Sequence, residues 1–174
     1  MFPTGVRTVR LRKSGMGIVE LPFKLLISII IVAATASAGL GALSMFSRNM
    51  LDQSLGQQAR MICSAAERLD EMGFGSSVEV RLEIDNAPMD HVEYFRIGYP
   101  LSAPVHPYSA MVRYKGSGSS EGHATARDAA DNFLPMCSAR GGTLALGAGE
   151  HALLLTKLYS DLFGTVFIEV SGAD

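Results

Sequence analysis

The sequence predicts an α+β protein, in which a long N-terminal helix, first hydrophobic and then amphipathic, packs on an antiparallel β-rich head domain. Three observations lead to this prediction. No charged residue occurs from Leu25 through Phe46, and about 20 apolar residues span a bilayer core as a helix. Apolar residues then recur at three-and-four spacing over residues 47–72, as on one face of a helix. Residues 74–174 contain short alternating runs separated by Gly and Pro, as strands do.

The residues before the apolar stretch are basic. They include the cations Arg7, Arg10, Arg12 and Lys13. No acidic residue occurs before Glu20. Because positively charged flanks of a membrane span stay on the cytoplasmic side, we expect the N-terminus in the cytoplasm and the head outside. The expected division is a basic leader at residues 1–15, a hydrophobic transmembrane or assembly helix at 16–46, an amphipathic continuation at 47–73 and an extracellular head domain at 74–174.

Glu20 and Lys24 mark the start of the apolar stretch and are one helical turn apart. A charge near hydrocarbon costs about 2.5–3.5 kcal/mol on insertion scales, so its presence needs a reason. Lys24 can reach the headgroups along its aliphatic stem. Glu20 can do the same, can pair with Lys24 in the favourable order, or has a role that the residues before it define.

The residues around Glu20 resemble the processing region of a type IV prepilin. The basic leader ends at Gly15, Met16 follows, and Glu20 is the fifth residue after the glycine, ahead of the long apolar helix. The closer likeness is to archaeal pilin-like proteins with a class III (prepilin-type) signal peptide, and it covers roughly residues 7–46. Met16 in place of phenylalanine, and Pro22 with Lys24 inside the apolar run, differ from bacterial major pilins.

This resemblance implies that a membrane-bound prepilin-type peptidase cuts between Gly15 and Met16 on the cytoplasmic side. It implies that Glu20 meets the N-terminal amine of a neighbouring subunit, that the partners are other copies or related pilin subunits, and that the fold has the lollipop outline of the pilin family. The expected function is a structural subunit, major or minor, of a type IV-like cell-surface filament that polymerises through its hydrophobic helix.

Two other interpretations remain open. A single-span anchored extracellular β domain would bind a ligand or partner without polymerising and would keep its leader. A secretory signal peptide has a basic region, about 7–15 apolar residues and a small-residue cleavage site. Ala36-Ser37-Ala38 matches that site, although the apolar run continues to Phe46. Cleavage near Ala38 would release the head as a secreted domain.

The charge balance argues against nucleic acid as a partner. The chain has 15 Lys and Arg and 17 Asp and Glu. Without the four cations of the leader, 11 basic residues face 17 acidic ones, a net charge of −6. Nucleic-acid binding rests on neutralising phosphates with Lys and Arg, so an acidic extracellular part is a poor match.

The amphipathic stretch is expected to continue the membrane helix. Its apolar stripe consists of Met50, Leu51, Leu55, Ile62, Leu69 and Met72. Gly73 follows the last of these and predicts a helix-ending cap. A helix from about Val19 to Met72 would be roughly 80 Å long at 1.5 Å per residue.

The head is expected to contain five or six strands. Residues 78–84 alternate strictly between apolar and charged side chains, as in a half-buried strand. The other expected strands are at 92–97, 110–115, 143–146, 151–158 and 165–170. Three prolines confine residues 99–108 to a loop, residues 116–120 form a flexible connector, and residues 124–134 favour one short helix stopped by Pro135.

Cys63 on the helix and Cys137 in the head are a candidate disulfide. Outside the cytoplasm an even cysteine count permits a bridge, and closing a loop of 74 residues is worth roughly 4 kcal/mol in the chain-entropy model. The alternative is two separate buried thiols, because free cysteine packs as a small hydrophobe. The sequence does not supply the geometry that decides between them.

No pattern predicts catalysis, a cofactor or a metal site, so we expect the chain not to be an enzyme. Residues 118–122 match G-x-S-x-G, but that motif acts at a strand-to-helix elbow on a parallel sheet, whereas the strands here alternate like those of an antiparallel sheet. The four histidines, which have neither i,i+4 partners nor a CxxC motif, are His91, His106, His123 and His151.

Aromatic residues gather around the proline-rich loop. They are Tyr94, Phe95, Tyr99, His106 and Tyr108. Aromatic side chains on loops are common recognition elements. The alternative is that about half of them belong to the core.

Overall fold

The computed structural model describes residues 17–172, with side chains from Leu21 onward. Helix α1 covers Gly17–Asp70, 54 residues, which is roughly 80 Å at 1.5 Å per residue. It continues through Pro22, where the sequence suggested an interruption of the apolar run. The chain forms two compact units, one that ends at Ala42 and a head unit, Leu43–Asp174.

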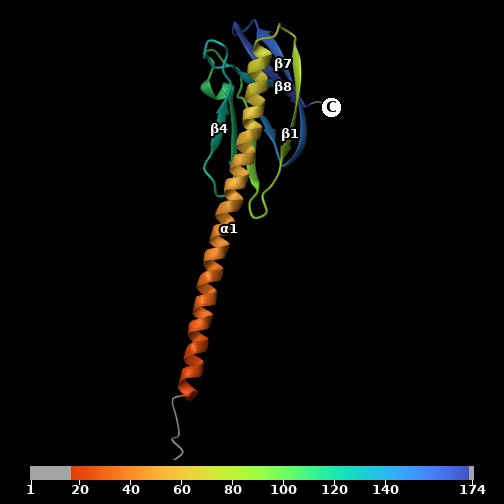
Figure 1. Ribbon diagram of the computed structural model, residues 1–174. Coiled ribbons are helices and arrows are strands. Elements are labelled where there is room, and N and C mark those ends of the chain that lie inside the picture. The colour runs from red at the N-terminus through yellow and green to blue at the C-terminus, as the bar shows by residue number, and fades with distance from the viewer. Residues whose placement is uncertain (1–16, 173–174) are drawn as a thin grey trace, which may run out of the picture. The chain divides into compact units, whose positions relative to one another are not determined.

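The head unit contains eight strands in two four-stranded sheets (Figure 1). The first sheet has the order β1-β7-β8-β5 and the second the order β4-β3-β2-β6. Their bounds are β1 Ser77–Ile84, β2 Val92–Ile97, β3 Met111–Gly116, β4 Gly122–Thr125, β5 Met136–Ser138, β6 Leu144–Leu146, β7 Gly149–Ser160 and β8 Thr165–Gly172. Neighbouring strands pair antiparallel except β5 and β8, which pair parallel. The predicted α+β class, with a helix on an antiparallel-rich head, is confirmed.

The predicted short helix at residues 124–134 is wrong. Residues 122–125 form β4, and Ala126 continues toward β3 by donating its backbone N–H to the Ala110 carbonyl at 2.8 Å. The carboxylate of Asp128 accepts the backbone N–H groups of Ala130 at 2.9 Å and Asn132 at 2.8 Å. Such side-chain bonds compete with helical backbone bonds and favour turns.

The predicted end of the long helix is also displaced. Helix α1 ends at Asp70 rather than Met72, and the glycine with positive φ is Gly75, at 79°, rather than Gly73. The reason is a contact with the sheet, because Gly75 donates its N–H to the Lys157 carbonyl at 3.0 Å. The chain therefore leaves the helix to join β7 before a glycine cap forms at Gly73.

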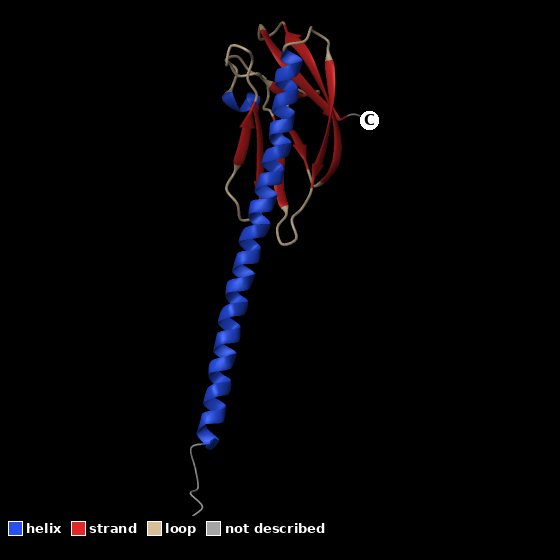
Figure 2. Cartoon of the chain, viewed as in Figure 1, coloured by secondary structure: helices blue, strands red, loops and turns tan. Residues whose placement is uncertain are grey.

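The C-terminal part of α1 supplies one wall of the core. Figures 1 and 2 show it lying across the head with strands on both sides, β4 on one side and β1 on the other. Its buried side chains, all at most 4% exposed, are Leu51, Leu55, Ala59, Ile62, Cys63, Ala65, Ala66 and Leu69. They pack in one cluster with inward-facing residues of both sheets, including Leu82, Phe95, Val112, Leu155 and Ile168. The amphipathic prediction is confirmed for Leu51, Leu55, Ile62 and Leu69, whereas Met50 and Met72 of the predicted stripe are 48% and 46% exposed.

Tyr114 of β3 lies close to a glycine of α1 and to a glycine of β4. A Cβ added at Gly56 would lie 2.8 Å from the Tyr114 hydroxyl, and one added at Gly122 would lie 2.4 Å from Cε2 of the same ring. Since side chains do not tolerate such distances, glycine at both positions leaves the space that the tyrosine ring occupies.

Lys157 joins the end of α1 to β7. Its Nζ donates to the backbone carbonyl of Asp70 and, at 3.2 Å, to that of Met72. It also lies 3.0 Å from the Asp70 carboxylate, with both side chains mostly buried at 11% and 19% exposed. A cation here satisfies the unpaired carbonyls of the last helical turn and its negative dipole end.

We expect Lys157→Met to destabilise the head by about 2 kcal/mol, because hydrogen bonds to charged groups are worth about 1.5–3 kcal/mol and the carbonyls would remain without a donor. Lys115→Met is the matched control, since Lys115 forms a surface pair with Glu93 at 2.8 Å, with side chains 33% and 34% exposed, and surface pairs are worth about 0–1 kcal/mol. Chemical denaturation of both variants measures the difference. Equal losses for the two lysines would contradict the role assigned to Lys157.

Candidate functional site: the apolar part of helix α1 and the head surface

The first part of α1 is an apolar helix that nothing in the described chain covers. Every residue from Leu21 to Leu43 is exposed. The large apolar residues of this part, from 41% to 70% exposed, are Leu21, Phe23, Leu25, Leu26, Ile27, Ile29, Ile30, Ile31, Val32, Leu40, Leu43, Met45 and Phe46. An 18-residue window here has a mean hydropathy of 2.2. By length and composition α1 can cross a membrane, as an anchor or as a signal.

Three hydroxyl groups within this part are satisfied by the helix itself. Ser28 donates to the Lys24 carbonyl at 2.9 Å, Thr35 to that of Ile31 at 3.0 Å and Ser37 to that of Ala33 at 2.8 Å. A polar group that already has a partner in its own helix does not need water. The segment is therefore compatible with an environment of lipid or of other apolar helices.

The predicted processing residues lie outside the described part of the chain. This applies to Gly15 and Met16, whereas the backbone of Glu20 belongs to α1 and its side chain is not described. Their predicted roles therefore stay predictions.

A polar cluster ties α1 to two head loops at the start of the head unit. The Arg48 guanidinium lies 3.7 Å from the Asp90 carboxylate, whose side chain is 7% exposed. Ser117 donates its hydroxyl to the same carboxylate oxygen at 3.1 Å, and the Ser47 hydroxyl accepts the Met89 N–H at 3.2 Å. The loops β1–β2 and β3–β4 are thus held against the helix. Sequence reasoning did not single out these residues.

The proline-rich loop carries an exposed aromatic group. The ring centroids of Tyr99 and His106 are 5.1 Å apart, and those of His106 and Tyr108 are 4.8 Å apart. Tyr99 and Tyr108 are 39% and 46% exposed. The end of the predicted loop contains the short 3-10 helix η1, Pro107–Ala110. These three rings are therefore on the surface, and their predicted role in recognition stays a prediction.

The other two aromatic candidates have structural roles. Phe95 is fully buried in the core. Tyr94 donates its hydroxyl to Glu121 at 2.6 Å, and this hydrogen bond raises the pKa of the tyrosine. Tyr94 thereby connects β2 to the chain just before β4.

The candidate disulfide is not formed, since Cys63 and Cys137 are both free and buried. Cys63 receives a backbone hydrogen bond from Val112 of β3, whereas Cys137 is paired in register with Glu169 of β8. Burial, with a smaller contribution from Glu67, raises the pKa of Cys63 to about 12. Burial, with a smaller contribution from Glu169, raises that of Cys137 to about 11. Both thiols are therefore unreactive at neutral pH.

The G-x-S-x-G stretch does not form a nucleophile elbow. Residues 118–122 connect β3 to β4, and a strand rather than a helix follows. The neighbouring His123 is exposed on β4. Within residues 17–172 no group of three or more His, Cys, Asp and Glu side chains is arranged to hold a metal ion.

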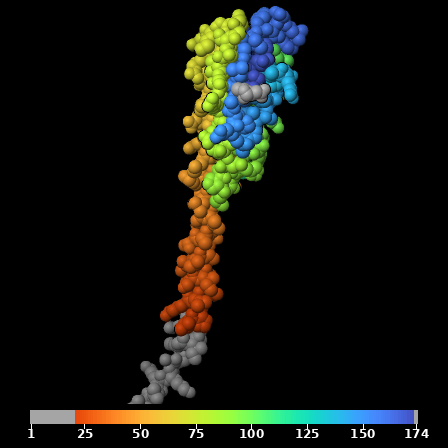
Figure 3. Space-filling model, turned by 90° about the vertical axis from the view of Figure 1, so that its right-hand side faces the viewer, coloured from red at the N-terminus to blue at the C-terminus, as the bar shows by residue number. Residues whose placement is uncertain are grey.

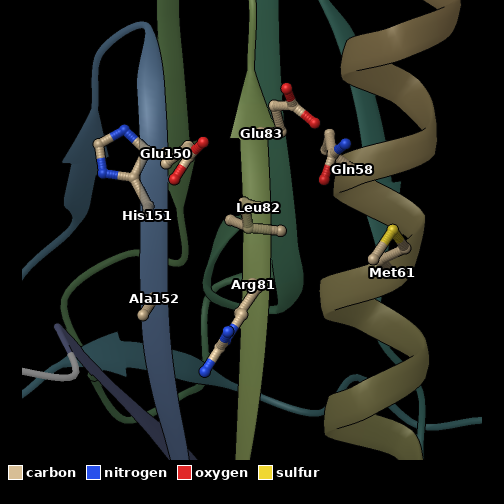
Figure 4. A pocket seen from close by; sticks show the side chains of 8 residues that line it. All are labelled: Gln58, Met61, Arg81, Leu82, Glu83, Glu150, His151 and Ala152. Carbon is tan, nitrogen blue, oxygen red and sulfur yellow. The ribbon is translucent and has the colours of Figure 1, made fainter.

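A groove of about 600 Å³ runs between α1 and the first sheet. Its lining residues are Gln58, Met61, Arg81, Leu82, Glu83, Glu150, His151 and Ala152. Figure 4 shows the Glu83 carboxylate directed toward Gln58 of α1, while the His151 ring points away from the helix. The His151 ring lies 2.9 Å from the Gly147 carbonyl, so no side-chain pair in this groove has the geometry of a nucleophile and its base.

Comparisons with protein-family models, with curated proteins and with solved structures find no match. The function must therefore be argued from the chain itself.

We expect both thiols to resist a thiol reagent such as Ellman's reagent at pH 8 in the folded protein and to react fully after denaturation. The raised pKa values also predict a loss of stability above about pH 9, where the unfolded thiols ionise and the folded ones stay protonated. Thiol titration in the native and denatured states, with intact mass measured without reductant, tests this. A mass lower by the two hydrogens of a disulfide would contradict it.

Proposed function

We propose that this chain is a structural subunit of a cell-surface filament of the type IV pilin kind. Before assembly it is anchored by α1, with its N-terminus in the cytoplasm and its head outside. The observation that carries the proposal is that one uninterrupted helix has an apolar, fully exposed first part and a second part that forms a wall of the head core. The prepilin-like residues Gly15 and Met16 precede this helix, and Glu20 lies near its start.

The proposed mechanism transfers the apolar part of α1 from lipid to a core made of neighbouring helices. Lipid and apolar side chains are similar solvents, so this transfer is governed by close packing rather than by the hydrophobic effect. Ala34, Ala38 and Gly41 allow helices to approach closely there. Glu20 would supply a charge that favours an oppositely charged neighbour and disfavours lipid.

A second function is supported by the exposed rings of Tyr99, His106 and Tyr108. A head anchored by one span and never polymerised would present this group for recognition of a ligand or partner. It would also keep the leader, which makes the two functions separable by the state of the N-terminus.

We expect Gly15→Val to block removal of the leader and to abolish surface filaments, while membrane insertion is unchanged. Gly17→Val is the matched control, since it alters a glycine two residues past the proposed cut. N-terminal sequencing and intact mass of the protein from membranes, with electron microscopy of the surface fraction, measure both effects. The wild type and the control should begin at Met16.

Other N-termini identify the alternatives. A wild-type chain that begins at Met1 would support the anchored binding domain, and one that begins just after Ala38 would support a released secretory domain. Normal filaments from Gly15→Val would reject the filament proposal in its prepilin form.

A further inference from the structure

The head contains two pairs of like charges. In each pair, the two residues lie directly opposite each other on neighbouring strands. Arg96 of β2 is directly opposite Arg113 of β3, and Glu83 of β1 is directly opposite Glu150 of β7. Directly opposed residues of antiparallel strands project from the same face with Cβ atoms about 4.5–5.5 Å apart, and like charges in this arrangement are destabilising. Within one head, each pair is therefore an unfavourable arrangement.

Neither pair is neutralised inside the described chain. The ion pairs there are Arg48–Asp90, Arg81–Glu79, Lys115–Glu93, Arg127–Asp131 and Lys157–Asp70. These use other charges of the same strands, for example Lys115 and Arg81, and leave the four residues of the like-charge pairs without an ion pair of their own in the described chain. Arg113 Nε is in addition buried without a hydrogen-bond acceptor.

The two arginines are held in place by aromatic rings. The Arg96 guanidinium lies 4.7 Å from the centroid of the Tyr94 ring, and that of Arg113 lies 5.1 Å from the centroid of Tyr108. Such stacking orders the side chain while the hydrogen-bond donors at its edge stay available for a carboxylate. The Glu121 carboxylate near this surface is engaged by the Tyr94 hydroxyl.

The pairs lie on different sheets of the head, and the glutamate pair lines the groove beside α1. The arginine pair belongs to the second sheet and the glutamate pair to the first, and the inner faces of both sheets meet in the shared core. Figure 3 shows the head from the side on which β1 lies in Figure 1, with blue atoms of the C-terminal part of the chain at the surface. One copy can therefore present its arginine pair to a second copy and its glutamate pair to a third.

We propose that Arg96 and Arg113 of one copy bind Glu83 and Glu150 of the next copy, so that the heads join through two different surfaces. This inference rests on the proposed filament and names the head contact within it. Contacts between unlike surfaces of identical subunits continue without limit unless the rotation closes a ring.

Charge reversal of each pair tests the contact in the full-length chain. One variant carries Arg96→Glu and Arg113→Glu, and the other carries Glu83→Arg and Glu150→Arg. Each variant alone brings like charges together at every contact, so we expect at least a tenfold loss of filaments by electron microscopy. Expressed together, the two variants are complementary at every contact and should restore filaments of alternating composition.

A matched control separates this effect from net charge. Arg60→Glu with Arg68→Glu makes the same change in net charge as Arg96→Glu with Arg113→Glu, but at exposed positions of α1, and it should assemble as the wild type does. Circular dichroism melts of all variants identify any that fail to fold. Normal filaments from either folded variant alone, or no recovery when the two folded variants are combined, would overturn the proposed contact.

Chemical coupling distinguishes the contact from the filament proposal. In an Arg96→Lys, Arg113→Lys chain, a carbodiimide should join the introduced amines to Glu83 or Glu150 of another copy in native membranes, as found by peptide mapping. Coupling without filaments would reject the filament and keep the contact between anchored heads. Filaments without coupling would reject the contact and keep the filament.

Discussion

The burial of one stripe of α1 is the interaction on which the rest of the head depends. Both sheets have an apolar inner face, and the described strands β4, β5 and β6 have only three or four residues each. Strands this short cannot cover a core between them. Leu51, Leu55, Ile62 and Leu69 fill that space from the helix side, and each fully buried side chain of this kind contributes about 1.5–3 kcal/mol. Ala59 and Ala66 between them let the sheets approach the helix.

Polar contacts at both ends of this stripe set the register of the helix in the head. At one end Arg48 and Ser47 hold the loops before β2 and β4. At the other end Lys157 binds the last carbonyls of α1 from β7. An apolar stripe alone tolerates a shift by one helical turn, because its residues recur every three or four positions. The two polar ends exclude such a shift, since both would lose buried partners at once.

The sequence predicted what is periodic and missed what depends on contact between distant residues. The alternation of residues 78–84 and the helical spacing of residues 47–72 each show locally which side chains are buried. The predicted bounds of α1 and of strands β1, β2 and β3 are therefore close to the observed ones. Strand β5 exists because of its parallel pairing with β8, and no local sequence pattern predicts it. Residues 124–134 have acceptable helix propensity, but the Asp128 carboxylate accepts hydrogen bonds from the backbone N–H groups of Ala130 and Asn132. Lys157 had a signal, as a single cation within the apolar run of β7, although its partner could not be named.

The same reasoning separates the charges that stabilise the head from those that remain for other molecules. Lys157 and Asp70 are mostly buried and complete the helix end, and Arg48 and Asp90 tie the loop before β2 to the middle of the helix. The Arg96–Arg113 and Glu83–Glu150 pairs do neither, because each places two equal charges side by side on the surface. The apolar part of α1 also lacks a partner within the molecule, since no part of the described chain covers it. A head that is stable through its own core can keep all three features exposed. In a filament, a neighbouring copy would supply the partner that each charge pair and the apolar part of α1 lack within their own chain.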